Sequence, residues 1–220
     1  MVSIIDRHAG HAGANVTCHD GRLSGEYPQI GLPAQKAKIM VAILSEEKIQ
    51  HARTLCQQGA WDEVLDFAQK WHAEDPADHK ALFYTGLGFS GQGKYVLAEK
   101  AYRQALKIDA TDIKAWNNLG GILFEHLKRP RDGIDCIEQA LKLSPENKLG
   151  WANLAAMVGR LGLHEKAIAY ADRAIALDPN LIEAYLYKAA AARALGKTDI
   201  VREVCEKLAT IEPDKFHRAR

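Results

Sequence analysis

Apolar and small residues recur along the chain in an order that predicts pairs of helices. Spacings of three and four residues place side chains on one face of a helix. One such run begins at Trp116, and a second run with the same order begins at Trp151, 35 residues later. Matched positions in the first run are Trp116, Leu119, Gly120, Leu123, Gly133, Ile137, Ala140 and Pro145, and those in the second are Trp151, Leu154, Ala155, Val158, Ala167, Ala171, Ala174 and Pro179. The order predicts a repeated unit of helix, turn, helix and stop.

The period extends in both directions from these two runs. Leu82 lies 34 residues before Trp116, Lys48 another 34 before that, and Tyr185 lies 34 after Trp151. We therefore expect five units, preceded by an extension over residues 1–44 and followed by a tail over residues 216–220. The expected units are 45–78, 79–112, 113–147, 148–181 and 182–215.

Three kinds of residue mark the interior of each unit. The eighth position is small throughout, which lets two helices approach closely: Ala52, Gly86, Gly120, Ala155 and Ala189. Glycines suited to a left-handed turn between helices are Gly59, Gly93, Gly162 and Gly196. Prolines that stop the second helix are Pro76, Pro145, Pro179 and Pro213. The third unit carries one extra residue in the turn 127–132, which also gathers Lys128, Arg129 and Arg131 on one edge.

The first 44 residues lie outside the period. Glycines, histidines and two prolines in residues 1–33 predict irregular or extended chain. A helix is expected over residues 34–44, after Pro33. Ser45 is then predicted to be the N-cap of the first unit, with Leu44 and Ile49 spaced as a hydrophobic staple.

Composition narrows the choice of partners and compartment. The chain has 47% hydrophobic and 26% charged residues, and 29 basic against 28 acidic residues give a formal net charge of +1. Nucleic acids and anionic membranes select basic surfaces, so neither is expected as a partner. No run of about 20 apolar residues predicts a membrane span, and the start of the chain lacks the apolar core of a signal peptide. We expect a cytoplasmic protein with free thiols at its four cysteines.

The repeated order resembles the tetratricopeptide repeat family, most closely between residues 113 and 181. The resemblance implies an all-α fold, a right-handed superhelix (α-solenoid) of antiparallel helix pairs whose first helices line a concave groove. It also implies a non-catalytic adaptor, scaffold or chaperone-like protein that binds an extended peptide there. The pentatricopeptide family, which reads single-stranded RNA, is disfavoured by the spacing of 34 and the near-neutral charge.

The resemblance assigns groove positions to the second, fifth, sixth, ninth and thirteenth residues of each unit. The candidate groove residues are Lys80, Phe83, Tyr84, Leu87, Lys114, Asn117, Asn118, Leu149, Asn153, Leu186 and Tyr187. Asn118 and Asn153 share the sixth position, where a carboxamide can both donate to and accept from a peptide backbone. Phe83, Tyr84 and Tyr187 are expected to supply apolar pockets beside them. Asparagines there also have a plain structural explanation, joining neighbouring helices. The set of lysines and asparagines that grips a carboxylate terminus in one subclass is absent from the matched positions.

Two other uses of the N-terminal extension stay open. His8, His11, Cys18 and His19 are weak candidate ligands for a metal such as zinc, although their spacing matches no known finger. The extension could also dock the chain, as an accessory subunit, on a larger assembly, or the stretch around Tyr27 and Pro28 could occupy the chain's own groove. No phosphate-binding loop or nucleophile motif is present, so neither an enzyme nor a cofactor is expected.

Overall fold

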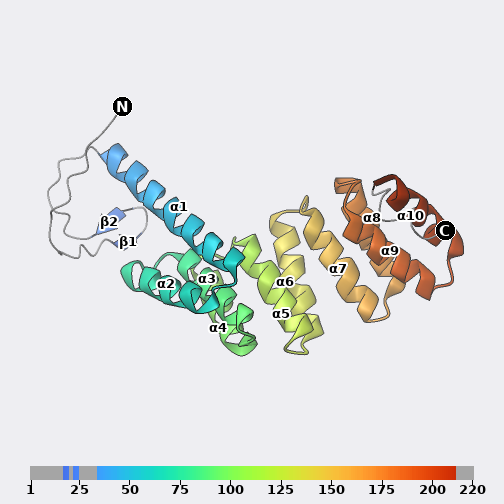
Figure 1. Ribbon diagram of the computed structural model, residues 1–220, viewed down its shortest axis with the longest axis horizontal. Helices are drawn as coiled ribbons and strands as arrows, with labels where there is room; N and C mark the ends of the chain where they lie inside the picture. Colours follow the sequence, from blue (N-terminus) through green and yellow to red (C-terminus); the bar gives the residue numbers. More distant parts are fainter. Residues whose placement is uncertain (1–16, 20–21, 25–33, 212–220) are drawn as a thin grey trace.

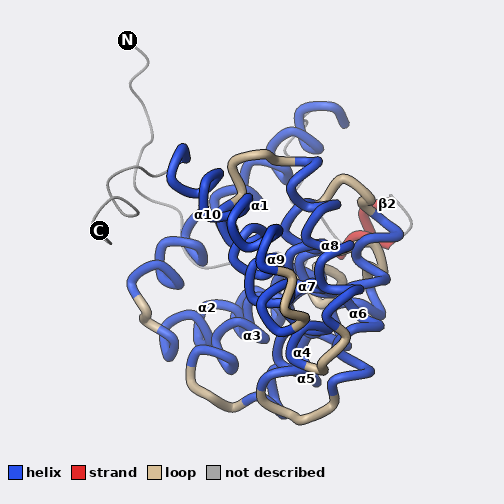
Figure 2. The backbone as a smooth tube through the Cα atoms, turned by 90° about the vertical axis from the view of Figure 1, so that its right-hand side faces the viewer, coloured by secondary structure: helices blue, strands red, loops and turns tan. Residues whose placement is uncertain are grey.

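The computed structural model describes residues 17–19, 22–24 and 34–211. Ten helices occupy this part of the chain, and each packs against its neighbours in sequence. They follow one another along the long axis of an elongated molecule (Figure 1). In the view turned by 90° the pairs lie one behind another (Figure 2). The expected all-α solenoid of antiparallel helix pairs is confirmed.

The helices have nearly constant lengths after the first. Their bounds are α1 Ala34–Gln58, α2 Trp61–Glu74, α3 His79–Gly91, α4 Tyr95–Ile108, α5 Ile113–Glu125, α6 Pro130–Leu143, α7 Lys148–Arg160, α8 His164–Leu177, α9 Ile182–Ala194 and α10 Thr198–Ile211. Three second helices end two residues before Pro76, Pro145 and Pro179, as predicted. Pro213 lies outside the described residues.

Helix α1 corrects one expectation at the N-terminal end. It is one continuous helix of 25 residues, so Ser45 lies in its interior and is not an N-cap. Residues 1–33 were expected to be irregular or extended, and two short strands there, β1 (Thr17–His19) and β2 (Arg22–Ser24), pair antiparallel with Cys18 opposite Leu23. The stretch around Tyr27 and Pro28 lies outside the described residues.

Turns within the pairs use the predicted glycines. Gly59, Gly93, Gly162 and Gly196 all have φ between 70° and 80°. In the third pair the corresponding residue is Lys128, the non-glycine residue with a positive φ, at 56°. The extra residue of that unit is accommodated here: the N–H of Arg129 bonds the carbonyl six residues back at Leu123, whereas the other turns reach back five residues.

The core runs through the array between paired helices. Small residues at the eighth position are needed, because a Cβ on Gly86 would lie 2.5 Å from the Tyr102 ring. A Cβ on Gly120 would lie 2.9 Å from the carbonyl oxygen of Gly133, so α5 and α6 touch backbone to backbone. In the last described pair, Val204 and Leu208 of α10 pack on α9, while the opposite side of α10 is exposed.

Candidate binding face

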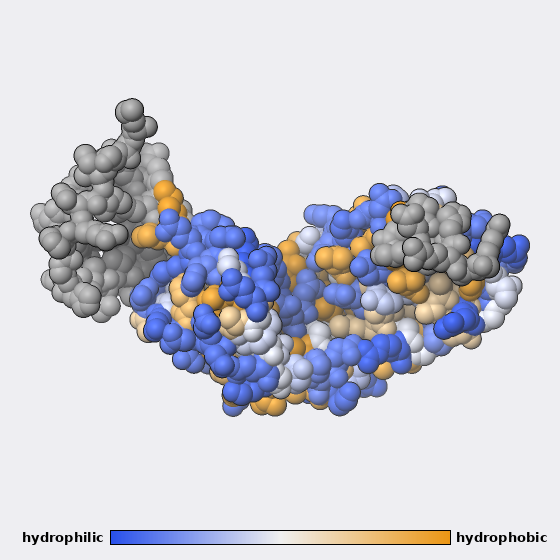
Figure 3. All heavy atoms as spheres, in the orientation of Figure 1, coloured by the Kyte–Doolittle hydropathy of each residue, from blue (hydrophilic) through white to orange (hydrophobic). Residues whose placement is uncertain are grey.

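The first helices of successive pairs place their second, fifth, sixth and ninth residues on one side, which we call the inner face. Two hollows open on it, one at each end of the array. A basic pocket lies between α1, α3 and α5, and an apolar pocket lies between α7 and α9. The molecular surface is also hollowed between its N-terminal and C-terminal ends (Figure 3). These features make the inner face the candidate binding site.

The basic pocket has a volume of about 490 Å³. It is lined by Ile49 and Arg53 of α1, by His79, Lys80, Phe83 and Tyr84 of α3, and by Asp109, Thr111, Asp112, Ile113 and Lys114 from the α4–α5 loop and the start of α5. Four of these residues, Lys80, Phe83, Tyr84 and Lys114, belong to the groove set expected from the sequence. Arg53 and His79 were missed; His79 begins a helix and Arg53 lies in the poorly matched first unit.

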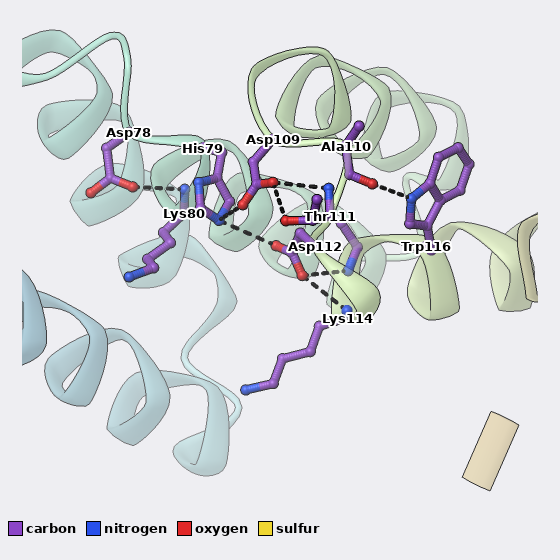
Figure 4. Close-up of polar contacts among 10 residues, drawn as sticks. Asp78, His79, Lys80, Asp109, Ala110, Thr111, Asp112, Lys114 and Trp116 are labelled. Carbon is purple, nitrogen blue, oxygen red and sulfur yellow. Dashed lines mark hydrogen bonds and ion pairs between the residues drawn. The ribbon is translucent and has the colours of Figure 1, made fainter. Parts of the chain in front are cut away.

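Carboxylates around the basic pocket are engaged within the protein. Asp112 accepts hydrogen bonds from the backbone N–H groups of Lys114 and Ala115 at 2.9 and 3.1 Å and so caps α5. Hydrogen bonds from Thr111 lower the pKa of Asp109. Nε2 of His79 lies 3.4 Å from Asp109 and 3.6 Å from Asp112, which links the start of α3 to the α4–α5 loop. Figure 4 shows the Lys80 and Lys114 side chains extending away from these carboxylates, toward the same side.

Aromatic residues of this region are buried more deeply than the sequence suggests. Phe83 and Tyr84 are only 8% and 6% exposed. The Tyr84 hydroxyl donates to the Ile49 carbonyl at 3.4 Å, and its ring stacks on Trp71 at 6.0 Å between centroids. Leu87 is half-buried against the same core. We therefore correct the expectation that Phe83 and Tyr84 form open apolar pockets: they are core residues with an edge on the basic pocket.

The two asparagines at the sixth position have different surroundings. The Asn118 carboxamide contacts the Tyr102 hydroxyl; burial raises the pKa of Tyr102, and this contact opposes the rise. Asn153 is exposed on α7. Asn117, at the fifth position, is half-buried, and its Oδ1 has no hydrogen-bond partner among the described residues. Asn118 thus has a structural contact, while Asn153 is open to a ligand.

The apolar pocket, of about 220 Å³, owes its space to small side chains. It is lined by Ala155, Ala156, Gly159 and Arg160 of α7, His164 of α8, and Tyr187, Ala190 and Ala191 of α9. Tyr187 was expected in the groove, and it is half-buried here. Two further groove candidates on the same helices, Leu149 and Leu186, are 54% and 47% exposed.

Arg160 is held at the edge of the apolar pocket by a neighbouring unit. Its guanidinium pairs with Glu125 and lies 5.0 Å from the centroid of the Phe124 ring. The hydrogen bond from Arg160 lowers the pKa of Glu125. A residue pair from α5 therefore holds one wall of the α7–α9 pocket in place, and no sequence pattern predicted this contact.

Other candidate sites receive no support from the described residues. Lys128 donates to the Glu125 carbonyl at 3.0 Å, and Arg129 pairs with Glu99 and Asp132, so two of the three cations in the 127–132 turn serve internal contacts. His8 and His11 lie outside the described part, and Cys18 and His19 fall on β1. Within the residues that the structure describes, no group of three potential metal ligands is found, and no helix is long and apolar enough to cross a membrane.

A repeat family and several solved structures are similar to this chain. The tetratricopeptide repeat family model matches residues 121–182. No curated protein sequence matches the chain. Among solved structures, the chain is similar to MamA (20% identity, TM-score 0.66, covering 80% of this chain and 95% of that one) and to YrrB, described as having an unusual peptide-binding site (18%, 0.61, 80% and 92%). It is also similar to PilF of Pseudomonas aeruginosa (23%, 0.69, 76% and 75%). At these identities the likeness shows the fold.

Proposed function

Since the chain carries tetratricopeptide repeats, matched by sequence over residues 121–182 and by fold along the array, we propose that it is a non-catalytic interaction protein. Its inner face holds an extended segment of a partner protein. The observation that carries this proposal is the position of the two pockets. Both open between successive first helices, and the lining of each includes residues at the positions that a bound segment would contact, such as Lys80 and Lys114 in one and Ala156 and Tyr187 in the other.

The physical character of the inner face supports a peptide-like ligand. Small residues at the ninth position, Gly121, Ala156 and Ala190, leave room along the face; a Cβ on Gly121 would meet nothing within 4 Å. Exposed Asn153 offers a donor and an acceptor between the two pockets. An extended segment exposes backbone donors and acceptors and alternating side chains, which suits such a surface. The similarity to YrrB, whose description mentions peptide binding, agrees with this proposal.

A second candidate function rests on helix α1. Helix α1 has 25 residues, whereas its partner α2 has 14. Ile43 and Leu44, in the first half of α1, are each 52% exposed. An accessory subunit that docks on a larger assembly through its N-terminal extension would bury such residues. Replacing both by serine would abolish assembly in that case and leave peptide binding on the inner face unchanged.

Selection from a displayed library of random twelve-residue peptides tests the proposal. The bait is the full chain, compared with Gly121→Trp, which fills the inner face, and with Glu138→Trp, a matched substitution at an exposed position of α6 in the same unit. We expect wild type and Glu138→Trp to bind the same peptides, and Gly121→Trp to lose them while circular dichroism shows an intact fold. Failure to select any peptide, or equal binding by Gly121→Trp, would overturn the proposal.

A further inference from the structure

The two ends of the inner face differ in chemistry, and this difference specifies the ligand. We infer, resting on the proposed function, that the bound segment is bipartite: it carries aspartate or glutamate at the basic pocket and a large apolar side chain at the apolar pocket. The inference comes from the charges and the small residues that line each hollow.

Three cations converge on the first pocket from three helices. Arg53, Lys80 and Lys114 line it, and the two lysines have no ion-pair partner among the described residues. Arg53 lies 3.9 Å from Glu46 and also contacts the Tyr84 hydroxyl. Facing carboxylates are Asp109 and Asp112, whose oxygens already accept backbone, hydroxyl and His79 contacts.

Lys80 is available to an external partner. It is half-buried and forms no ion pair among the described residues, and its side chain extends to the same side as that of Lys114 (Figure 4). A ligand carboxylate between Lys80 and Lys114 would form charge-assisted hydrogen bonds with both. An acidic segment is therefore complementary to this end of the face, whereas a basic segment would be repelled.

The second pocket selects an apolar side chain. Four alanines and one glycine make its walls, with the Tyr187 ring beside them. Arg160 and His164 are the polar residues of its lining, and Nδ1 of His164 is buried without a hydrogen-bond partner in the described structure. Leu149 and Leu186 continue the apolar character along α7 and α9. Burying one aliphatic or aromatic side chain here removes apolar surface of both partners from water.

The array fixes the distance between the two contacts. The pockets lie two units apart, at α3–α5 and at α7–α9. A helix with its side chains is about 10 Å across, so two helix widths put the pockets on the order of 20 Å apart. An extended chain advances about 3.3 Å per residue. The acidic and apolar residues of the ligand are thus expected about six positions apart, with Gly121 and Asn153 beneath the chain between them.

The test repeats the peptide selection with variants of each pocket. Lys80→Gln with Lys114→Gln removes the basic contacts, and Lys107→Gln with Lys142→Gln, at exposed positions of α4 and α6, is the matched charge control. Ala190→Phe fills the apolar pocket, and Ala176→Phe, at an exposed position of α8, is its control.

We expect wild type to enrich an acidic residue about six positions from a large apolar one. By fluorescence anisotropy, the Lys80/Lys114 variant should bind a selected peptide at least about tenfold more weakly and lose most of its salt dependence. Ala190→Phe should weaken the same peptide while keeping its salt dependence; both controls should bind as wild type does. Selected peptides that Gly121→Trp blocks but that lack this pattern would overturn the inference and leave the proposed function standing. No selected peptide at all would overturn both.

Discussion

At the scale of single residues, two adjacent glycines on α5 have opposite surroundings. A Cβ on Gly120 would lie 2.8 Å from Ile137 and 2.9 Å from the Gly133 carbonyl, whereas one on Gly121 would meet nothing within 4 Å. Gly120 is therefore required by packing between helices, and Gly121 is required by nothing in the fold. The glycine that the fold does not need lies on the inner face, where we place the ligand.

This contrast predicts opposite effects for the same substitution. Gly120→Ala should lower the free energy of unfolding by about 1–3 kcal/mol, because two backbones must separate. Gly121→Ala should raise it by about 1 kcal/mol, because alanine loses less backbone entropy in a helix. Urea denaturation of the two variants measures both; the same sign for both would contradict the packing described for α5 and α6.

Lys128 offers a second test at this scale. It adopts φ of 56°, a region that costs a side-chain-bearing residue about 1 kcal/mol and that glycine enters freely. Lys128→Gly should therefore stabilise the chain by about that amount. Lys128→Ala removes the contact with the Glu125 carbonyl but keeps the strain, so it serves as the control and should not stabilise.

The residue types predicted the close approaches and turns between helices better than they predicted which side chains are exposed. The small eighth positions and the turn glycines follow from the sequence alone, because close approach and positive φ admit few residue types. Burial of Phe83 and Tyr84 could not be read in the same way, since Trp71 replaces the alanine of later units and the aromatic rings repack around it. Arg53 of the basic pocket was missed because its unit matches the repeat poorly.

At the scale of helices, one contact recurs at each junction between later units. The Nε1 atoms of Trp116 and Trp151 donate to the carbonyls of Ala110 and Pro145 at 2.9 and 2.8 Å. Tyr185 does the same with its hydroxyl, to Pro179 at 3.2 Å. Each bond ties a first helix to the loop that precedes it, which explains why the fourth position in these units is an aromatic residue with a donor.

Trp151→Phe tests this contact, because phenylalanine keeps an aromatic ring and removes the donor. We expect a loss of about 1 kcal/mol in the free energy of unfolding. Trp61 is the matched control: its ring packs over Gly91, and its Nε1 makes no hydrogen bond within the described residues. If Trp61→Phe were as costly as Trp151→Phe, ring size rather than the hydrogen bond would be responsible.

The N-terminal boundary of the first unit was predicted wrongly from the sequence. Ser45 followed by two glutamates has the composition of a helix start, but the same residues are tolerated inside a helix. No proline or glycine interrupts residues 34–58, so extending the helix costs less than ending it and nucleating another. The order of helices elsewhere was predictable because most turns contain a proline or glycine; the α4–α5 loop, with Ala110 in place of the proline, is an exception.

At the scale of the whole molecule, the free energy of unfolding should depend on pH in the alkaline range, because two titratable side chains are buried. Burial raises the pKa of the Cys136 thiol to about 11, and it raises the pKa of Tyr102 above 10.0. The folded chain favours the neutral forms, so this stability is complete below the unfolded pKa of about 9 and is lost as pH rises toward 11. Between pH 8 and 10.5 the free energy of unfolding should fall, by about 1 kcal/mol for Cys136.

Cys136→Ala should flatten this pH dependence in urea denaturation under reducing conditions. Cys205 is exposed on α10, so Cys205→Ala is the control and should leave the slope unchanged. An identical slope in wild type and Cys136→Ala would show that the thiol is not desolvated in the folded chain.

The central claim is that a partner segment lies along the inner face of α3, α5, α7 and α9. Photo-crosslinking tests it most directly: a selected peptide carrying a benzophenone between its acidic and apolar residues is irradiated with the full chain, and the linked residues are identified by mass spectrometry. We predict crosslinks to α5 and α7, around Gly121 and Asn153. Crosslinks concentrated on α4, α6 or α8, or on residues 1–33, would contradict the account.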